Sequence, residues 1–410
     1  MSLHSRKRSN SDLIETKKKI KLLDNRINER SIYDKYFFQL DKNKQIEILE
    51  KEDEIYNFYN DKVPLRYRIL YSDLSNSIKF FILQKIDFFD SLSTNDSEYH
   101  KLSKWIYGVS LIPFNVYIDL PISISDKSPK IKDFLLSTYE KLEKTIYGQY
   151  QAKNKIIEIM AQWISNPKSK SQIIALEGPP GVGKTSLIKD GVSVALNRPF
   201  SFYALGGASD ITSLEGHSYT YEGAAWGRIV EMLMESKVMN PIIFFDELDK
   251  ISSTSRGNEI NGLLIHLTDP TQNNIFQDKY FSGINLDLSR VLFFFSFNDI
   301  NKINPILKDR LTIIKFNSYK LSEKIEITKK FLVPDILKNI GIQQEDIIIS
   351  EKIIEYIIKK IDNEEPGMRK IKKCFEDIFL KINLIRFMEN SEIKIEFPFE
   401  ITESIINKLT

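Results

Sequence analysis

The sequence predicts an α/β fold, in which a parallel β-sheet is wrapped by helices, with a helical region before it and a helical domain after it. Three observations support this prediction. Between residues 173 and 314, short runs that are apolar on both faces alternate with helical stretches, as in buried parallel sheets. A glycine-rich turn directly follows the first run. Residues 32–125 and 321–390 instead carry apolar residues mainly at helical spacing.

The chain begins with a basic segment, residues 1–31. Its first 30 residues contain nine Lys and Arg against four Asp and Glu, a net charge of +5. Such a charge run is most simply a solvated, disordered tail. The alternative is an arm that directs the protein to the nucleus or contacts nucleic acid.

The next region, residues 32–125, is predicted to be helical. Apolar residues gather between Ile78 and Ile86, and Tyr99, Leu102, Trp105 and Ile106 recur at helical spacing. Prolines at 113 and 121 close this region as an extended connector. A further helical stretch is predicted over residues 131–164, and it ends before Asn166-Pro167.

The predicted sheet occupies residues 126–317, and the predicted helical domain occupies residues 318–410. In the helical domain, Pro334 and Gly341 are expected to end the first helix, and Glu365-Pro366-Gly367 to open another. The strands are predicted from the apolar runs Ile173–Leu176, Ile242–Phe245, Val291–Phe297 and Ile313–Ile314.

Composition excludes several other classes of protein. The single cysteine, Cys374, rules out a disulfide within the chain and a zinc cluster built on cysteines. The apolar runs are far shorter than the roughly 18 residues of a transmembrane helix, so we expect no membrane association. We expect a cytoplasmic protein, with the nucleus as the alternative that the basic tail suggests. The heavy use of Ile, Lys and Asn is typical of an AT-rich genome, such as that of a large DNA virus or a protist.

The glycine-rich turn fits the complete P-loop pattern. Its glycines allow backbone N–H groups to surround phosphates at the start of a helix. The lysine reaches the β- and γ-phosphates, and the threonine hydroxyl binds Mg²⁺. The sequence therefore predicts that ATP and Mg²⁺ are bound here. The motif consists of Gly178, Pro179, Pro180, Gly181, Val182, Gly183, Lys184 and Thr185.

Polar residues follow two of the other predicted strands. Asp246 and Glu247 end the second apolar run, where Asp246 would hold Mg²⁺ and Glu247 would activate the attacking water. Asn298 ends the third run. It could hold the water or the γ-phosphate, but a turn-forming Asn before Asp299 is the simpler interpretation of the spacing alone.

From about Trp105 to Leu409 the chain resembles the ATPase module of the Lon protease family. The resemblance implies a P-loop AAA+ αβα sandwich that is followed by a helical lid, and, more weakly, a small helical subdomain before Trp105. The residues that carry it, in order, are Leu205-Gly206-Gly207, Gly216-His217, Thr220-Tyr221, Gly227-Arg228-Ile229, Asp246-Glu247-Leu248-Asp249-Lys250, Asp269-Pro270, Gln272-Asn273, Phe276 and Leu307-Lys308-Asp309-Arg310.

The resemblance assigns roles that the spacing does not supply. Asn298 matches the sensor-1 residue, and Arg369 the sensor-2 arginine that touches the γ-phosphate from the lid. Arg310 matches the arginine finger, which completes the site of a neighbouring subunit. Tyr147-Gly148 is similar to the segment that lines the adenine pocket. These roles imply a homo-oligomeric ring, a hexamer in the family.

Two departures from the family pattern bear on function. Where the pore loop has a Tyr followed by an aliphatic residue, this chain has Tyr221 followed by Glu222. The chain also shows no Ser–Lys peptidase segment, and it stops near the point where that domain would begin. We therefore expect a ring ATPase that remodels polypeptide clients without intrinsic protease activity. The alternatives are a nucleic-acid-linked AAA+ motor or loader, and an unfoldase that serves a separately encoded peptidase.

Overall fold

The computed structural model describes residues 32–59, 63–166, 173–207, 210–221, 223–361, 366–388, 395 and 397–409. The chain divides into two compact units, Met1–Tyr71 and Ser72–Thr410. The described part of the first unit is helical, as the sequence predicts. The predicted basic tail lies outside the described residues, and so does Glu222. The helices of the first unit are α2 (Ile32–Gln39), α3 (Lys42–Tyr59) and α4 (Leu65–Tyr71).

The second unit begins with two helices, α5 (Asn76–Ser91) and α6 (Ser97–Leu111). The Ser75 hydroxyl caps α5 by accepting a hydrogen bond from the Ile78 amide. The helices pack through aromatic side chains. Phe81 meets Trp105 edge to face at 6.1 Å, and Phe89 stacks on Tyr99 at 4.9 Å. The two helices are therefore in contact at two positions along their length.

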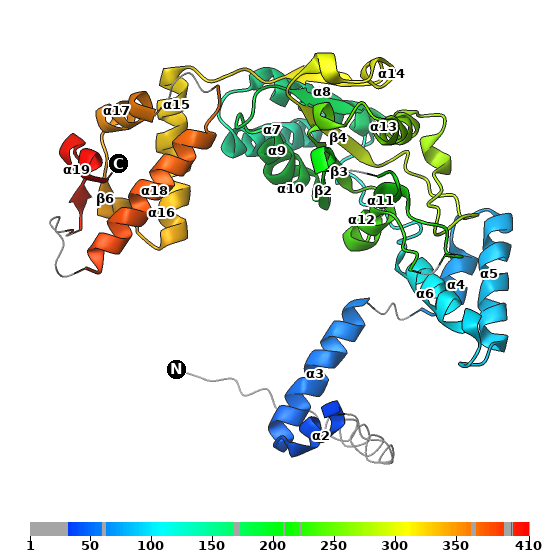
Figure 1. The fold of residues 1–410 in the computed structure, drawn as a ribbon. Coiled ribbons are helices and arrows are strands. Elements are labelled where there is room, and N and C mark those ends of the chain that lie inside the picture. Colours follow the sequence, from blue (N-terminus) through cyan, green and yellow to red (C-terminus); the bar gives the residue numbers. More distant parts are fainter. Residues whose placement is uncertain are drawn as a thin grey trace. The chain divides into compact units, whose positions relative to one another are not determined.

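The second unit contains a sheet of five parallel strands in the order β2-β3-β4-β1-β5 (Figure 1). This arrangement confirms the predicted fold class. Strand β2 was not predicted. It forms an edge of the sheet and only Ser201 of its five residues is buried, so it lacks the continuous apolar run of the central strands. The strands are β1 (Ile174–Glu177), β2 (Phe200–Ala204), β3 (Ile242–Asp246), β4 (Leu292–Phe297) and β5 (Thr312–Lys315).

Helices cover the sheet because its central strands are apolar on both faces. One face forms a core with α7 (Ser128–Thr145), α8 (Tyr150–Ser165) and the helical segment from Lys184 to Leu196. On the other face, Phe245 stacks on Phe293 and Phe295. The remaining helices of this part are α11 (Thr212–Glu215), α12 (Arg228–Ser236), α13 (Ser255–Thr268) and α14 (Pro305–Lys308).

The helix predicted over residues 131–164 is in fact two helices. The chain breaks between α7 and α8, where Gly148 and Gln149 both have positive φ angles, 62° and 54°. A single helix cannot continue through left-handed backbone. The break matters for function because it contains the predicted adenine-pocket residues.

The C-terminal helices form a second core of their own, which we call the lid. Pro334 does not end a helix as predicted. The helical backbone continues through it, from α15 (Leu321–Ile327) and a π-helical turn, Thr328–Leu332, into α16. The π-turn interrupts the regular hydrogen-bond ladder next to Pro334, which has no N–H to donate. Gly341 does end α16, with a φ of 72°. The elements are α15 (Leu321–Ile327), α16 (Val333–Ile340), β6 (Ile347–Ile348), α17 (Glu351–Ile361), α18 (Arg369–Arg386), β7 (Phe399–Glu400) and α19 (Glu403–Leu409).

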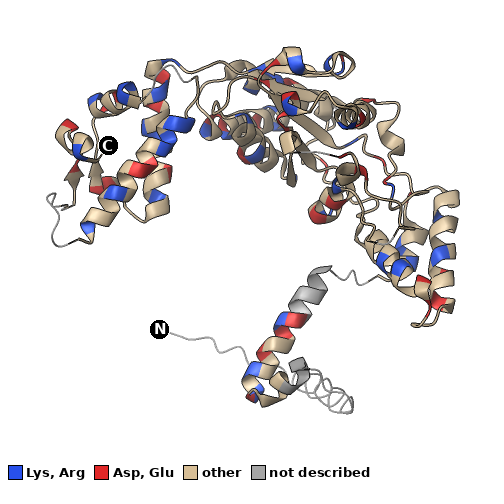
Figure 2. Cartoon of the chain, viewed as in Figure 1, with Lys and Arg blue, Asp and Glu red and all other residues tan. Residues whose placement is uncertain are grey.

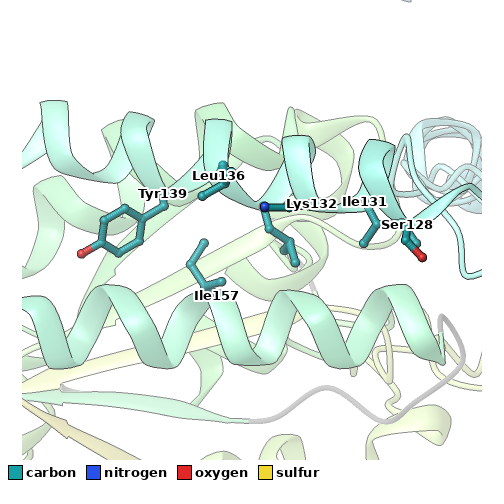
Figure 3. Close-up of a pocket in the computed structure, with 7 residues that line it drawn as sticks. Ser128, Ile131, Lys132, Leu136, Tyr139 and Ile157 are labelled. Carbon is teal, nitrogen blue, oxygen red and sulfur yellow. The ribbon is translucent and has the colours of Figure 1, made fainter.

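Two further observations concern membrane-spanning helices and cavities. Among the described helices, none is long and apolar enough to span a bilayer. A mainly apolar hollow of about 420 Å³ lies between α7 and α8 (Figure 3). None of the predicted site residues lines this hollow, so it is separate from the predicted nucleotide site. Its lining residues are Ser128, Ile131, Lys132, Leu135, Leu136, Tyr139 and Ile157.

Candidate nucleotide site

The predicted site residues meet at one edge of the sheet because the strands are parallel. Glu177, the last residue of β1, is in register with Phe297, the last residue of β4. The P-loop follows the first of these strands, and Asn298 follows the second. Strand β3 pairs with the other side of β4 and ends at Asp246. The fold therefore brings together three segments that are more than 50 residues apart in sequence.

Lys184 lies at the centre of this edge. Its side chain is buried, and its ammonium donates hydrogen bonds to the carbonyls of Gly178, Pro179 and Phe297 and, at 2.8 Å, to the side-chain oxygen of Asn298. Burial lowers the pKa of Lys184, and the nearby charge of Asp246 partly offsets that effect. The structure thus places Asn298 beside the P-loop lysine.

These residues fit a phosphate group. All four hydrogen-bond acceptors of the Lys184 ammonium are neutral, and among the described residues it has no ion-pair partner within 4 Å. A buried cation is stabilised by an anion. The backbone around it is already bent into a cradle, because Gly181 and Gly183 have φ angles of 79° and 91°. The arrangement suits the phosphates of ATP.

Asp246 and Glu247 differ in their surroundings. Asp246 is half-buried, and one of its carboxylate oxygens accepts hydrogen bonds from the Ser296 hydroxyl and from the Glu247 amide. Glu247 is exposed and has a left-handed backbone, with a φ of 59°. A side chain on Gly206 would collide with the Glu247 carboxylate. The Asp246 carboxylate is therefore held in place by two hydrogen bonds, and the exposed Glu247 carboxylate packs close to Gly206.

The lid contacts the P-loop directly through the start of α18. The Met368 amide donates to the Gly181 carbonyl at 3.0 Å, and Arg369 begins the helix beside it. A Cβ atom built on Gly181 would lie 3.1 Å from the Arg369 nitrogen. The structure therefore places the backbone and Cβ atom of Arg369 beside the P-loop, and its sensor-2 role stays a prediction.

Tyr147 and Gly148 lie where the break between α7 and α8 meets both the P-loop and the lid. The Tyr319 hydroxyl, which the sequence did not single out, lies 2.9 Å from the Val182 carbonyl and 3.3 Å from the Tyr147 carbonyl. Burial raises the pKa of Tyr319, which keeps its hydroxyl protonated as a donor. Nothing about a lone Tyr after β5 marks it as special in the sequence.

Arg310 is placed differently. Its guanidinium forms an ion pair with Asp269 at 2.8 Å and donates to the Ile265 carbonyl at 3.3 Å. Asp269 accepts hydrogen bonds from the Thr271 hydroxyl and amide, and together with Arg310 these lower the pKa of its carboxyl. Arg310 thus contacts the end of α13, and none of its described contacts is with the P-loop of its own chain.

Tyr221 is 69% exposed in the segment between α11 and α12. We call the described residues 216–221 and 223–227 the Tyr221 loop. Its base is held by Asp278, a fully buried residue that the sequence did not single out. One Asp278 oxygen accepts from the Gly227 amide at 2.7 Å, and the other from the Tyr280 amide at 2.8 Å. An acidic residue in an ordinary turn sequence gives no sign of such burial.

Comparisons with known proteins agree with this geometry. Residues 174–319 match the family described as "ATPase family associated with various cellular activities (AAA)". The chain is also 36% identical over 382 residues to a Lon protease homolog of Acanthamoeba polyphaga mimivirus. The chain contains an AAA ATPase module of the Lon type. The predictions of the family and of an ATP hydrolase are confirmed at this level.

Other relatives of this AAA module include cellular Lon proteins. The chain is 33% identical over 390 residues to the Lon protease of Campylobacter jejuni, and 30% identical over 350 residues to the mitochondrial Lon protease homolog of Drosophila melanogaster. These alignments cover 92% and 85% of the chain. The chain spans only 36% of the mimivirus relative, 47% of the Campylobacter relative and 32% of the Drosophila relative.

Proposed function

We propose that this chain hydrolyses ATP and uses the energy to remodel polypeptide clients, acting as a homo-oligomeric ring. The observation that carries the proposal is the convergence on Lys184. The Asn298 side chain accepts a hydrogen bond from its ammonium, and the first residues of lid helix α18 contact the same P-loop. A nucleotide bound there would touch both the sheet and the lid, so its hydrolysis can move one against the other.

Each site residue has a role that its position supports. Bound ATP with Mg²⁺ supplies the phosphoanhydride bond that is cleaved. Lys184 and the P-loop amides would hold the phosphates, while Thr185 and Asp246 would hold the metal ion. The exposed carboxylate of Glu247 would take a proton from the attacking water, which Asn298 would orient. Arg369 would contact the γ-phosphate from the lid, and Tyr147-Gly148 would lie against the adenine.

The placement of Arg310 supports the ring. Its described contacts are with the end of α13 and not with its own P-loop, so its guanidinium would act on the site of a neighbouring subunit. A contact that pairs two different surfaces repeats from subunit to subunit, and it closes into a ring when the rotation between subunits allows it. We propose six subunits, on the resemblance to Lon.

The client is proposed to be a polypeptide because of Tyr221. An exposed aromatic side chain on a loop offers a contact that tolerates many sequences. Glu222 beside it would add negative charge around the ring and disfavour acidic segments. These 410 residues contain no Ser–Lys peptidase pair that the resemblance would carry over, so the proposal assigns them remodelling without cleavage of peptide bonds.

The test compares wild type with two variants, measuring ATP binding, ATP turnover and the unfolding of a basic and an acidic tagged protein. Glu247→Gln should bind ATP but lose turnover, because an amide cannot accept the proton from water. Tyr221→Ala should keep turnover within a few-fold and lose unfolding, because its nucleotide site is intact. Wild type should unfold the basic client faster.

Two outcomes would contradict the proposal. Equal loss of binding and turnover in Glu247→Gln would remove its assigned role. Stimulation of ATP turnover by DNA and by none of the proteins would favour the nucleic-acid motor instead. A pull-down with Glu247→Gln in ATP would then identify the bound partner in either case.

A further inference from the structure

The helices α5 and α6 contact both sides of the Tyr221 loop. On the side that precedes Tyr221, the Lys85 ammonium of α5 lies 4.4 Å from the ring centre of Tyr219 and 3.4 Å from its hydroxyl. On the side that follows Tyr221, the Lys104 ammonium of α6 donates to the Ala224 carbonyl at 2.6 Å. Figure 2 marks the basic residues on these two helices in blue.

Both lysines sit among aromatic rings: Lys85 among rings of the two helices and of the loop, and Lys104 between a ring of the loop and one that follows Asp278. Phe81 and Trp105 complete the surroundings of Lys85, at 5.2 and 4.8 Å from its ammonium. The ring centres of Trp226 and Tyr280 lie 5.9 and 5.7 Å from the Lys104 ammonium. A cation over several ring faces is attracted to each of them, and this attraction is stronger for the half-buried Lys85 than for the exposed Lys104. Moving the loop would therefore remove part of the surroundings of each lysine.

The same rings join the two helices to the base of the loop. Trp105 of α6 lies 6.1 Å from Phe281, and Phe281 stacks on Trp226 at 5.9 Å with the planes 19° apart. On Gly108 a Cβ atom would lie only 2.7 Å from Phe281, so α6 approaches as closely as a glycine allows. The helix pair and the loop base are thus one packed aromatic cluster, with the two lysines on its loop side.

We propose that α5 and α6 form a support that sets the position of the Tyr221 loop, with Lys85 and Lys104 as its positioning residues. The inference rests on the proposed function of Tyr221 as a client contact. Neither lysine is in the nucleotide site, so their effect is on client engagement and not on ATP hydrolysis itself. A force on the loop from a client would be transmitted to α5 and α6 through these two contacts and through the aromatic cluster.

The experiment uses the full chain with ATP. Lys104→Met keeps most of the side-chain length but removes the charge and the hydrogen-bond donor, and Lys104→Arg keeps both. The matched control is Lys101→Met, one turn earlier on α6, where the ammonium lies 3.7 Å from Glu98 of its own helix. Two readouts are measured: amide hydrogen exchange of the described loop residues, and the KM for a basic client in client-stimulated ATP turnover.

We expect Lys104→Met to raise both the exchange rate of the loop amides and the client KM by about tenfold, the effect of losing one charge-assisted hydrogen bond. Basal ATP turnover and the thermal midpoint should stay near those of wild type. Lys104→Arg and Lys101→Met should resemble wild type. Lys85→Met should also raise the exchange rate and the client KM, because it removes the contact of α5 with Tyr219 on the other side of the loop.

The hydrogen exchange decides the inference separately from the proposed function. If wild type shows no response to any client, the proposed function fails, but a faster loop in Lys104→Met still supports the positioning role. If Lys104→Met and Lys85→Met match Lys101→Met in loop exchange, the positioning role is overturned, whatever the client response. A fall in thermal midpoint of more than about 5 °C in Lys104→Met that Lys104→Arg does not share would exceed the loss of one hydrogen bond. It would show that the contact orders more than the loop, and would also overturn the positioning role.

Discussion

At the scale of single residues, this protein depends on two buried ionisable groups that do opposite things. Lys184 is buried among neutral acceptors, so its charge is available to an anion from outside the chain. Asp278 is buried among backbone amides, and both of its carboxyl oxygens accept hydrogen bonds from within the chain. The first prepares a site for ligand, and the second fixes the base of a loop.

Asp278 should make stability depend on pH. Burial raises the pKa of Asp278 from 3.8 to about 7, although the amides of Gly227, Tyr280 and Phe281 act in the other direction, and Glu215 adds to the rise. Between these values the folded state keeps a proton that the unfolded state releases. The free energy of unfolding should therefore fall as pH rises through this window.

The measurement is denaturant unfolding of wild type and Asp278→Asn at about pH 5 and about pH 7.5. Wild type should lose about 2 kcal/mol more than the variant between the two conditions, since one unit of pKa is worth about 1.4 kcal/mol. The variant cannot ionise at this position and should show the flatter profile. Parallel profiles for the two proteins would contradict the assignment.

At the scale of elements, the important contact is between the lid and the P-loop. Gly367 lies just before α18, and a Cβ atom there would be 2.9 Å from the carbonyl carbon of Gly181. The Tyr319 hydroxyl donates a second hydrogen bond to the P-loop, at the Val182 carbonyl. The lid therefore touches the phosphate cradle at backbone level, where even one methyl group is too large.

Gly367→Ala should push α18 away from the P-loop. We expect ATP affinity to fall by roughly tenfold or more, because an overpacked contact must shift the backbone that carries Arg369. The control is Gly262→Ala in α13, where a Cβ atom would meet nothing within 4 Å. It should leave ATP affinity unchanged and stabilise the fold by about 0.5–1 kcal/mol, as Ala does in helix interiors. Equal ATP affinities in the two variants would show that the lid contact is not needed for binding.

At the scale of the whole molecule, Arg310 is the predicted site residue that would act in an assembly and not within a single chain. Its guanidinium is paired with Asp269, and none of its described contacts reaches its own phosphate site. Under the proposed function, an isolated chain would bind ATP with its own residues, Arg369 included, but would lack the arginine finger. A second copy would supply it.

Mixing two inactive variants tests this arrangement. Lys184→Ala should lose ATP binding, and Arg310→Ala should keep it while losing turnover by roughly 10³-fold or more, as in other P-loop enzymes with arginine fingers. In a mixed assembly, the intact P-loop of the second variant can meet the intact arginine of the first. Part of the ATPase activity should return on mixing, measured beside a check that the two variants co-assemble. Co-assembly without recovery would mean that Arg310 does not act on a neighbour.

The sequence by itself determined the central strands, the P-loop and the order of the polar residues that follow the strands. These features are local, since a short run that is apolar on both faces and bounded by turn residues favours a buried strand, and a complete glycine-rich P-loop pattern before a helix has few other uses. Even so, the edge strand β2 and the break at Gly148 escaped detection. Half-exposed residues carry no continuous pattern, and one glycine in a helical stretch is ambiguous.

Only the tertiary structure decided which residues meet. The contact of Lys184 with Asn298, the closeness of Gly367 to Gly181, and the hold of Lys104 on Ala224 each join segments more than 100 residues apart. The roles of Tyr319 and Asp278 also arise this way, because burial, and not residue type, gives a hydroxyl or a carboxyl its partners. Such contacts depend on how the layers pack, and packing is a property of the whole chain that no local pattern contains.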